Sequence, residues 1–275
     1  MTEWQIALTV LGSAAGASLI ALILWLSNNL IETTRYFVTL GGIVQTVKVV
    51  QISDLHGKSF GSHNAKLISK VRLLAPDVIA ITGDIIHRYT ERNKRVALET
   101  VSALSQIAPV LYISGNHEMR NKGYRFFRKS VMEAGAVVLD NAERQVCGVT
   151  FVGLNGAHNK NDTLSKISSD TQNKVLLAHM PHCFKNYAKG GYALVLSGHA
   201  HGGQWRIPLT KQGIYAPGQG LLPKYTSGAH TLGNTKMIIS RGLGNSQFPL
   251  RLFNRPELVV VTLSPADAQP QICSL

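Results

Sequence analysis

Five short polar motifs, each placed directly after a run of apolar β-type residues, constrain this sequence more than any other feature. The motifs are Asp54-Leu55-His56, Gly83-Asp84, Gly115-Asn116-His117-Glu118, Ala178-His179 and Gly198-His199-Ala200-His201, and the runs before them read VKVVQIS, VIAITG, VLYISG, KVLLA and LVLSG. Buried strands that end at Asp, His or Asn place these side chains along one edge of a sheet. Imidazole, carboxylate and amide groups gathered in this way suit a pair of divalent cations.

The remaining pattern predicts an α/β domain. Apolar residues have helical spacing at 64–74, 91–107 and 124–134, and a short helix is expected near 183–188. Strands are predicted at 46–53, 78–82, 110–114, 137–139, 145–147, 150–154, 174–178, 194–197, 204–207, 236–240 and 257–263. Strands and helices alternate first and β-rich segments follow, which predicts a four-layer αββα sandwich of two mixed sheets flanked by helices. We expect the last three strands to be antiparallel and residues 208–234 to form loops over the site.

The first thirty residues carry a separate signal. The run from Ile6 to Leu26 is 21 residues long and contains no charge, and Trp4 and Trp25 lie near its ends. This length and these flanks are typical of one transmembrane helix. A cleaved signal peptide is the alternative, but no Lys or Arg precedes the run and its small residues lie inside it. We therefore expect residues 1–35 to form an uncleaved membrane anchor with a short exit segment, and residues 36–275 to form one domain.

Charge and cysteine content narrow the setting. Arg35 and Lys48 follow the span and no basic residue precedes it, so the positive-inside rule places the domain in the cytoplasm, on a bacterial-type inner membrane. The net charge of +13 fits a solvated basic surface, or attraction to membrane lipids and a phosphorylated substrate. No nucleic-acid-binding motif is present and no protein partner is predicted. Cys147, Cys183 and Cys273 show neither a disulfide framework nor a CxxC spacing, which fits a reducing compartment.

The chemistry of the motifs points to phosphate esters. Their hydrolysis needs an activated water and a positive charge beside the phosphoryl oxygens, and two divalent cations roughly 3.5–4 Å apart supply both. Such a pair requires a bridging carboxylate, and Asp84 suits this role because Gly83 lets the backbone approach closely. Asp54 and His56, two residues apart, would share one face of a regular strand. Ligands without thiolate fit Mn²⁺ first, with Fe or Zn²⁺ as alternatives.

In their order, the motifs resemble those of the calcineurin-like metallophosphoesterases over about residues 46–265. The resemblance implies one metal held by Asp54, His56 and His201, a second held by Asn116, His179 and His199, and a bridge formed by Asp84. It also implies that Asn116 stabilises charge on the substrate and that a catalytic His117 assists the leaving oxygen. Glu118 would fix the tautomer of a nearby imidazole, and Gln204 would have a supporting role.

Structural roles compete with functional ones at single positions. Asp54 and Asp84 can each cap a helix, and Asn116 can be a turn residue. The remaining histidines are taken as core or surface residues: His63, His87, His158, His182 and His230. These explanations account poorly for ligand-type residues that end five strands in the same order as the family, so we favour the metal site.

The late segment SRGLGN, followed by Pro249, Arg251, Phe253 and Pro256-Glu257, narrows the resemblance to a membrane-associated branch. This branch includes phosphoesterases of lipid-linked sugar nucleotides, so UDP-2,3-diacylglucosamine, cleaved to the lipid monophosphate and UMP, is the leading substrate. Arg241 is expected to bind a substrate phosphate, although a loop arginine without this role fits equally well. A broad-specificity or other envelope phosphodiesterase is the second hypothesis, and a metal-free scaffold of the same fold is the third. Unlike lipid-A enzymes with an acyl-binding insert, the chain has only a short polar stretch at 155–173.

Overall fold

The computed structural model describes residues 2–156, 173–245 and 248–266. One sheet contains β1 (Glu32–Leu40), β2 (Val47–Ile52), β3 (Val78–Thr82), β4 (Val110–Ile113), β5 (Ala136–Val138) and β14 (Glu257–Pro265). The other contains β6 (Ala142–Val146), β7 (Val149–Gly153), β8 (Lys174–Leu177), β9 (Leu194–Ser197), β12 (Gly228–Leu232) and β13 (Thr235–Ile239). Around them lie α1 (Glu3–Asn29), α2 (Ala65–Leu74), α3 (Glu91–Ser105), α4 (Asn116–Met119), α5 (Tyr124–Glu133), α7 (Phe184–Lys189), the 3-10 turns η1 (Ser62–Asn64), η2 (Pro181–Cys183) and η3 (His201–Gly203), and a small ribbon of β10 (Tyr215–Ala216) and β11 (Gly220–Leu221).

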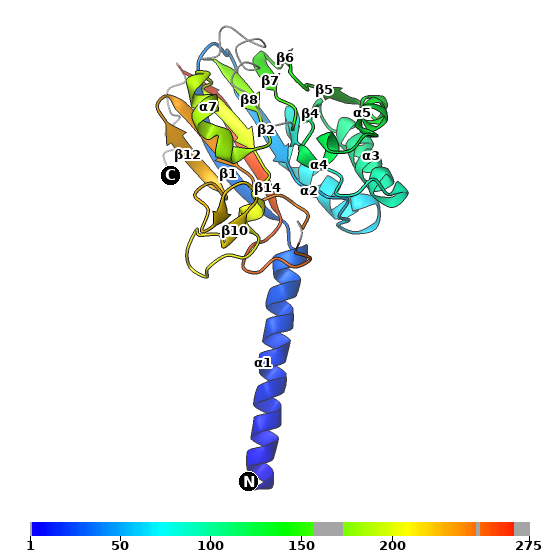
Figure 1. Ribbon diagram of the computed structural model, residues 1–275, viewed down its shortest axis with the longest axis vertical. Coiled ribbons are helices and arrows are strands. Elements are labelled where there is room, and N and C mark those ends of the chain that lie inside the picture. The colour runs from blue at the N-terminus through cyan, green and yellow to red at the C-terminus, as the bar shows by residue number, and fades with distance from the viewer. Residues whose placement is uncertain (1, 157–172, 246–247, 267–275) are drawn as a thin grey trace.

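The two sheets stack face to face, with helices on their outer faces (Figure 1). Their strand orders are β1-β14-β2-β3-β4-β5 and β12-β13-β9-β8-β7-β6. Both sheets mix parallel and antiparallel pairs, because β14 is antiparallel to β2 and β6 is antiparallel to β7. The αββα sandwich predicted from the sequence is therefore confirmed. His158 and Cys273, and most of the polar stretch at 155–173, lie outside the described residues.

Alternating side chains on buried strands build three apolar layers. In β3, Val78 and Ala80 pack between the sheets, whereas Ile79 and Ile81 pack in the layer that holds α2, α3 and α5. The outer face of the second sheet packs against Phe184 and other residues in and around α7. Since both faces of each sheet are covered, central strands are apolar throughout instead of alternating with polar residues.

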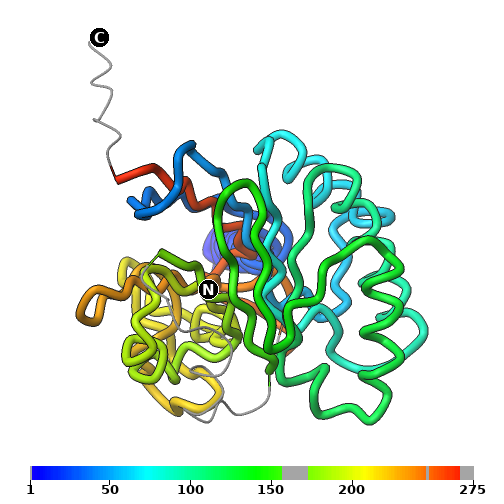
Figure 2. The backbone as a smooth tube through the Cα atoms, turned by 90° about the horizontal axis from the view of Figure 1, so that it is seen from above, coloured from blue at the N-terminus to red at the C-terminus, as the bar shows by residue number. Residues whose placement is uncertain are grey.

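Helix α1 extends away from these layers (Figure 1) and is seen end-on behind the domain in Figure 2. Its 27 residues include an 18-residue stretch with a mean hydropathy of 2.2, none of which is buried, so by length and composition the helix is able to cross a membrane. Its C-terminal end is attached to the domain. The side chain of Asn28 donates to the carbonyl oxygen of Arg251 (3.0 Å) and accepts from the backbone N–H of Arg251 (2.9 Å).

Several segments differ from the sequence prediction. β1 begins at Glu32 and pairs in parallel with β14, so residues 32–35 belong to the sheet and not to an exit segment. This strand was missed because it lies at the sheet edge, where Glu32, Arg35 and Thr39 are exposed, as is the apolar Phe37, so no alternation of apolar and polar residues marks it. The strand predicted at 204–207 is wrong, since Trp205 and Arg206 form only isolated bridges.

The late strands also differ in direction and number. β13 is antiparallel to β12 but parallel to β9, and β14 is antiparallel to β2 but parallel to β1. The expectation of a purely antiparallel late region is therefore wrong. The region 208–234, expected to be loops, contains β10, β11 and β12. Local composition does not carry this information, because strand direction is set by which neighbour a strand meets across the chain.

The attachment of α1 predicts where the chain can be shortened. A protein that begins at Ser27 keeps Asn28, the buried Ile31 and all of β1, and we expect it to unfold at the temperature of the full domain. One that begins at Tyr36 loses both side chains and four β1–β14 residue pairs. Burial of an Ile side chain stabilises by about 1.5–3 kcal/mol, so the midpoint should fall by roughly 5–10 °C. Calorimetry that gives equal midpoints would contradict this attachment.

Candidate metal centre

The candidate ligands come from the carboxyl ends of strands in both sheets. In the first sheet, β2, β3 and β4 run parallel, and in the second sheet β8 and β9 run parallel. The ligand positions that follow these five strands are Asp54 and His56, Asp84, Asn116, His179, and His199 and His201. Because the two sheets stack, both sets of strand ends meet at one place, and all seven side chains are buried there.

One group of ligands consists of Asp54, His56 and His201. Each offers a nitrogen or oxygen atom, and these atoms lie within 4.8 Å of one another. The Nε2 atoms of His56 and His201 are 3.1 Å apart, and Nε2 of His201 is 3.4 Å from Oδ1 of Asp54. This group has the membership that the family resemblance implied for the first metal.

A second group consists of Asp84, His179 and His199, whose ligand atoms also lie within 4.8 Å of one another. Nε2 of His179 is 3.2 Å from Nδ1 of His199 and 3.2 Å from Oδ1 of Asn116. Asn116 therefore joins this group, as the resemblance implied for the second metal. The structure brings the expected side chains together, and their occupation by metal stays a prediction.

Asp84 connects the two groups. Its Oδ2 atom lies 3.2 Å from Nε2 of His179 in the second group and 3.8 Å from Nε2 of His56 in the first. A carboxylate in this position can contact cations on both sides. Together, four imidazoles, two carboxylates and one amide without thiolate form a donor set that fits Mn²⁺, Fe or Zn²⁺.

The backbone at five of the seven positions is left-handed. The φ angles of Asp54, His56, Asp84, His199 and His201 lie between 49° and 68°. This conformation is rare for residues other than glycine and costs on the order of 1–3 kcal/mol at each position. β2 ends at Ile52, so Asp54 and His56 do not share a strand face as the sequence spacing suggested. The left-handed backbone instead turns successive side chains toward the site.

Two glycines in the motifs make room for the carboxylates. A Cβ atom at Gly115 would lie 2.0 Å from Oδ1 of Asp84, and one at Gly198 would lie 1.9 Å from Oγ of Ser53 and 2.5 Å from Oδ2 of Asp54. No side chain fits at either position. The Gly-Asn and Gly-His pairs in the sequence therefore reflect the close approach of backbone to carboxylate.

Hydrogen bonds orient several ligands. Asp54 accepts from Oγ of Ser53 (2.6 Å) and from the backbone N–H of His199 (3.0 Å). His179 donates through Nδ1 to the carbonyl oxygen of Thr82 (2.8 Å), which leaves Nε2 for the cluster. These contacts fix the carboxylate of Asp54 and the ring of His179 before any ligand binds.

Glu118 supports the site differently from the expectation. It accepts hydrogen bonds from the backbone N–H groups of Gly115 (2.7 Å), Asp84 (2.9 Å) and Ile86 (3.1 Å). It therefore holds two ligand-bearing loops together through their backbones, and these bonds do not involve an imidazole. Gln204 also binds backbone, since its Nε2 atom donates to the carbonyl oxygens of Phe248 (3.0 Å) and Leu250 (2.9 Å).

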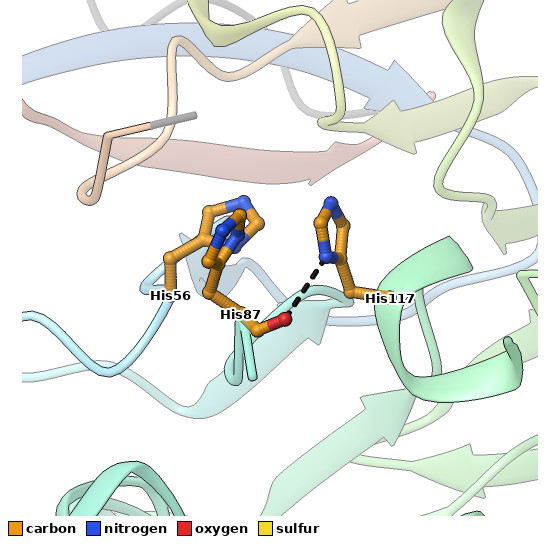
Figure 3. Close-up of side chains that lie close together, drawn as sticks. All are labelled: His56, His87 and His117. Atoms are coloured by element: carbon orange, nitrogen blue, oxygen red, sulfur yellow. Dashed lines mark hydrogen bonds between the residues drawn. The ribbon is translucent and has the colours of Figure 1, made fainter. Parts of the chain in front are cut away.

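His117 lies beside the ligands at a more open position. Its Nδ1 atom donates to the carbonyl oxygen of His87 (3.2 Å, Figure 3), and its Nε2 atom lies 3.9 Å from Oδ2 of Asp84. The side chain is 28% exposed, whereas that of Asp84 is 2% exposed. Substrate can therefore approach His117, as its proposed role requires.

His87, taken from the sequence as structural, is part of this cluster. Its ring centroid is 4.8 Å from that of His117 and 5.2 Å from that of His56 (Figure 3). One ligand atom from each of these three rings lies within 4.8 Å of the others. His87 follows Asp84 by three residues in the same loop. This spacing is the sequence signal that would have identified it as part of the site.

The other histidines that were expected to be core or surface residues lie in different surroundings. His63 is exposed and pairs with Glu99 (2.9 Å), and the ring of His230 packs against Tyr225 (5.1 Å between centroids). Both fit the structural role expected of them. His182 lies closer to the site, with its ring centroid 5.8 Å from that of His199.

Arg241 is engaged in ion pairs. Its guanidinium group lies 3.0 Å from a carboxylate oxygen of Glu257 and 3.2 Å from one of Glu32, and its backbone N–H donates to Glu257 (2.8 Å). These contacts join the start of β1 to the start of β14. The structure therefore gives Arg241 a structural role, and phosphate binding by this residue stays a prediction.

Burial sets the protonation of the cluster. It lowers the pKa of His56 and His199 to about 3 and that of His201 well below its usual value, so these rings are neutral and able to bind metal. It also raises the pKa of Asp54 to about 6. Burial alone would raise the pKa of Asp84 and lower that of His179. The attraction between the two groups outweighs burial, so it raises the pKa of His179 to about 10 and holds that of Asp84 well below its usual range.

Metal binding should therefore release protons. Ligation requires a neutral His179, which is protonated below about pH 10 in the metal-free protein, so near pH 8 we expect about one proton released and an affinity for Mn²⁺ that rises about tenfold per pH unit. Below about pH 6 Asp54 also binds a proton, and the dependence should steepen. Titration calorimetry in buffers of different ionisation enthalpy measures this release, with the exposed His63→Ala variant as the control. An affinity independent of pH would contradict the assignment of His179.

Comparison with known proteins agrees with this geometry. The family model described as calcineurin-like phosphoesterase matches residues 47–203. The uncharacterized metallophosphoesterase YkuE of Bacillus subtilis is 30% identical, with 87% of each chain covered. Phosphodiesterase YaeI of Escherichia coli is 27% identical over 78% of this chain and 82% of its own. A Danio rerio protein named transmembrane protein with metallophosphoesterase domain is 26% identical over 80% of this chain and 54% of its own.

The matched region begins with β2 and ends with η3, so it includes every candidate ligand described above. The whole-length similarity to YkuE extends the relationship to the rest of the domain. The chain belongs to the calcineurin-like phosphoesterase family and is a metallophosphoesterase, a hydrolase of phosphate esters.

Proposed function

We propose that the protein is a membrane-anchored phosphohydrolase with two metal ions that cleaves a phosphodiester or pyrophosphate bond in an amphiphilic substrate. The observation that carries this proposal is the position of Asp84, whose Oδ2 atom contacts His56 in one ligand group and His179 in the other. Two divalent cations, Mn²⁺ first and Fe or Zn²⁺ as alternatives, supply Lewis acidity and an activated water when bound.

The chain's own residues bind and orient the substrate and move a proton. We propose that the amide of Asn116, whose Oδ1 atom lies at the edge of the second group, donates through its Nδ2 atom to a phosphoryl oxygen. His117 faces the leaving group. Its Nδ1 proton is engaged by the carbonyl oxygen of His87, so the proton for the leaving oxygen comes from Nε2 of the imidazolium form, and the neutral Nδ1–H ring is left after the transfer. The ring is also held in place by this bond, since the carbonyl is part of the backbone.

Helix α1 supports the membrane setting. Its apolar stretch is exposed along its length, and the Danio rerio relative carries a transmembrane name. We propose that α1 crosses a bacterial-type inner membrane with the domain on the cytoplasmic side, on the basis of Arg35 and Lys48 after the span. The span and the net charge of +13 favour a lipid-linked phosphate, and UDP-2,3-diacylglucosamine is the leading candidate.

A second candidate is a phosphodiesterase of broad specificity or of another envelope component. The name of the YaeI relative, phosphodiesterase, supports this broader activity. A metal-free scaffold of the same fold receives no support, because scaffolds of this kind lose ligands, whereas here every ligand position is filled and the side chains converge.

A substrate panel separates these candidates. With Mn²⁺ added, we expect the full-length protein to release UMP from UDP-2,3-diacylglucosamine and to cleave the soluble diester bis(p-nitrophenyl) phosphate more slowly. Metal content is measured on the same sample. Cleavage of the soluble diester without UMP release would favour the broad phosphodiesterase. No cleavage of any diester by protein that contains two equivalents of metal would contradict the proposed function.

Two substitutions separate catalysis from metal binding. His117→Ala should retain metal and lower turnover by roughly 10²–10⁴-fold, because it removes only a proton donor. Asp84→Asn should lose metal as well as activity, because it removes the shared carboxylate. The matched control is His63→Ala, a histidine on the exposed surface. Metal analysis and turnover of the soluble diester are measured for all three, and unchanged turnover in His117→Ala would show that this histidine is not the proton donor.

A further inference from the structure

Loops beside α1 expose large apolar side chains. We call residues 203–224 and 248–253 the loop lobe. Its exposed members include Trp205, Leu209, Tyr215, Leu221, Leu222 and Phe248. Leu209 is fully exposed, and Leu221 and Leu222 are 76% and 64% exposed. Single exposed leucines are ordinary on a soluble protein, but a group of this kind on adjoining loops is typical of a surface that meets another apolar phase.

The lobe lies at the end of the domain from which α1 leaves. Figure 1 shows the loops around β10 next to the C-terminal end of this helix. The hydrogen bonds between Asn28 and Arg251 join the helix end directly to the lobe, and the exposed side chains of Leu250 and Phe253 flank Arg251. If α1 crosses a bilayer, the end of the span and the lobe must therefore meet the bilayer surface together.

An apolar cavity lies inside the lobe, and one of its walls is connected through the chain to the candidate ligand His201. It has a volume of about 330 Å³ and is lined by Trp205, Ile214, Tyr215, Leu221 and Phe248, with Gln204 at its wall. A volume of this size is at the lower end of the range for ligand pockets. Gln204 follows His201 by three residues, and the side chain of Asn254 donates to the carbonyl oxygens of both (3.0 and 2.7 Å). The cavity wall and a metal ligand are thus held by one side chain.

The charge of this region suits an anionic membrane. Residues 171–256 contain no Asp or Glu, and the lobe carries Arg206, Lys211 and Lys224. Basic residues near the surface of an anionic leaflet are attracted to it. Apolar side chains with basic residues among them are the combination found where proteins lie in the membrane interface.

We propose that the loop lobe inserts its apolar side chains into the bilayer surface beside α1, and that its cavity holds an acyl chain of a phosphorylated lipid whose phosphate lies at the metal centre. This inference rests on the proposed membrane span and phosphohydrolase activity. The substrate enters from the bilayer along the lobe, so its apolar part leaves the lipid phase without crossing water.

Membrane contact is tested with the full-length protein in nanodiscs of anionic and neutral phospholipid. Single cysteines labelled with nitrobenzoxadiazole replace Leu221 in the lobe, Leu11 in α1 and Leu73 on the exposed surface of α2, in a background without the native cysteines. Label in lipid is protected from reduction by dithionite, and label in water is not. We expect protection at the Leu221 and Leu11 positions and rapid reduction at the Leu73 position. Rapid reduction at Leu221 with protection at Leu11 would overturn the inference while leaving the span intact.

Delivery of lipid is tested with two diesters that share a leaving group. Wild-type protein in nanodiscs is given bis(p-nitrophenyl) phosphate or dioleoylphosphatidyl-p-nitrophenol. The double variant Leu209→Asp, Leu222→Asp changes two exposed leucines of the lobe that do not line the cavity. It should cleave the soluble diester at the wild-type rate and the lipid diester about 10- to 100-fold more slowly, because two apolar side chains that enter the bilayer are lost. The control Leu73→Asp, Phe126→Asp replaces two large apolar side chains that are exposed outside the lobe. It should leave both rates unchanged.

The outcomes distinguish this inference from the proposed function. Equal loss of both rates in the lobe variant would show damage to the metal centre and would overturn the acyl-chain assignment, as would no loss of either rate. If wild-type protein cleaves neither diester, the phosphodiesterase proposal fails, and the dithionite result still decides whether the lobe contacts lipid.

Discussion

The burial of two carboxylates and four imidazoles where the two sheets meet is the constraint on which the rest of the structure depends. Ionised groups in such surroundings are costly unless they are paired or bind cations. Here Asp84 is paired with His179, and Asp54 accepts hydrogen bonds from Ser53 and from the backbone of His199. Left-handed backbone at five ligand positions adds further cost. The large apolar layers on both sides of each sheet supply the stability that this arrangement uses.

Much of the fold could be predicted from the sequence because the central strands are buried on both faces. Strands such as β3 and β9 read as short continuous apolar runs, and the amphipathic helices between the early strands are spaced in the usual way for α/β units. β1 could not be found in this way. It lies at an edge, most of its exposed residues are polar, and it is joined to the sheet by pairing with a strand more than two hundred residues away.

The membership of the site could be predicted, but its local geometry could not. Strand ends marked the ligands, and the stacking of the two sheets brought them together. Regular strand alternation did not explain Asp54 and His56, because the strand had already ended and backbone conformation set their directions. Glu118, His87 and Arg241 illustrate the limit. Glu118 contacts backbone groups, His87 contacts a ring, and Arg241 contacts carboxylates. These partners depend on loops from distant parts of the chain.

The connection between α1 and the domain is very short. Only Leu30 and Ile31 separate the last residue of the helix from the first residue of β1. Asn28 is also hydrogen-bonded to Arg251, which is distant in the sequence. Such a joint does not allow the domain to swing freely as it would on a long linker. If the helix lies in a membrane, the height and tilt of the metal centre above the lipid headgroups are fixed. The enzyme would then meet phosphate esters by diffusing sideways within the membrane plane, and those it reaches would depend on how far each phosphate projects from the surface.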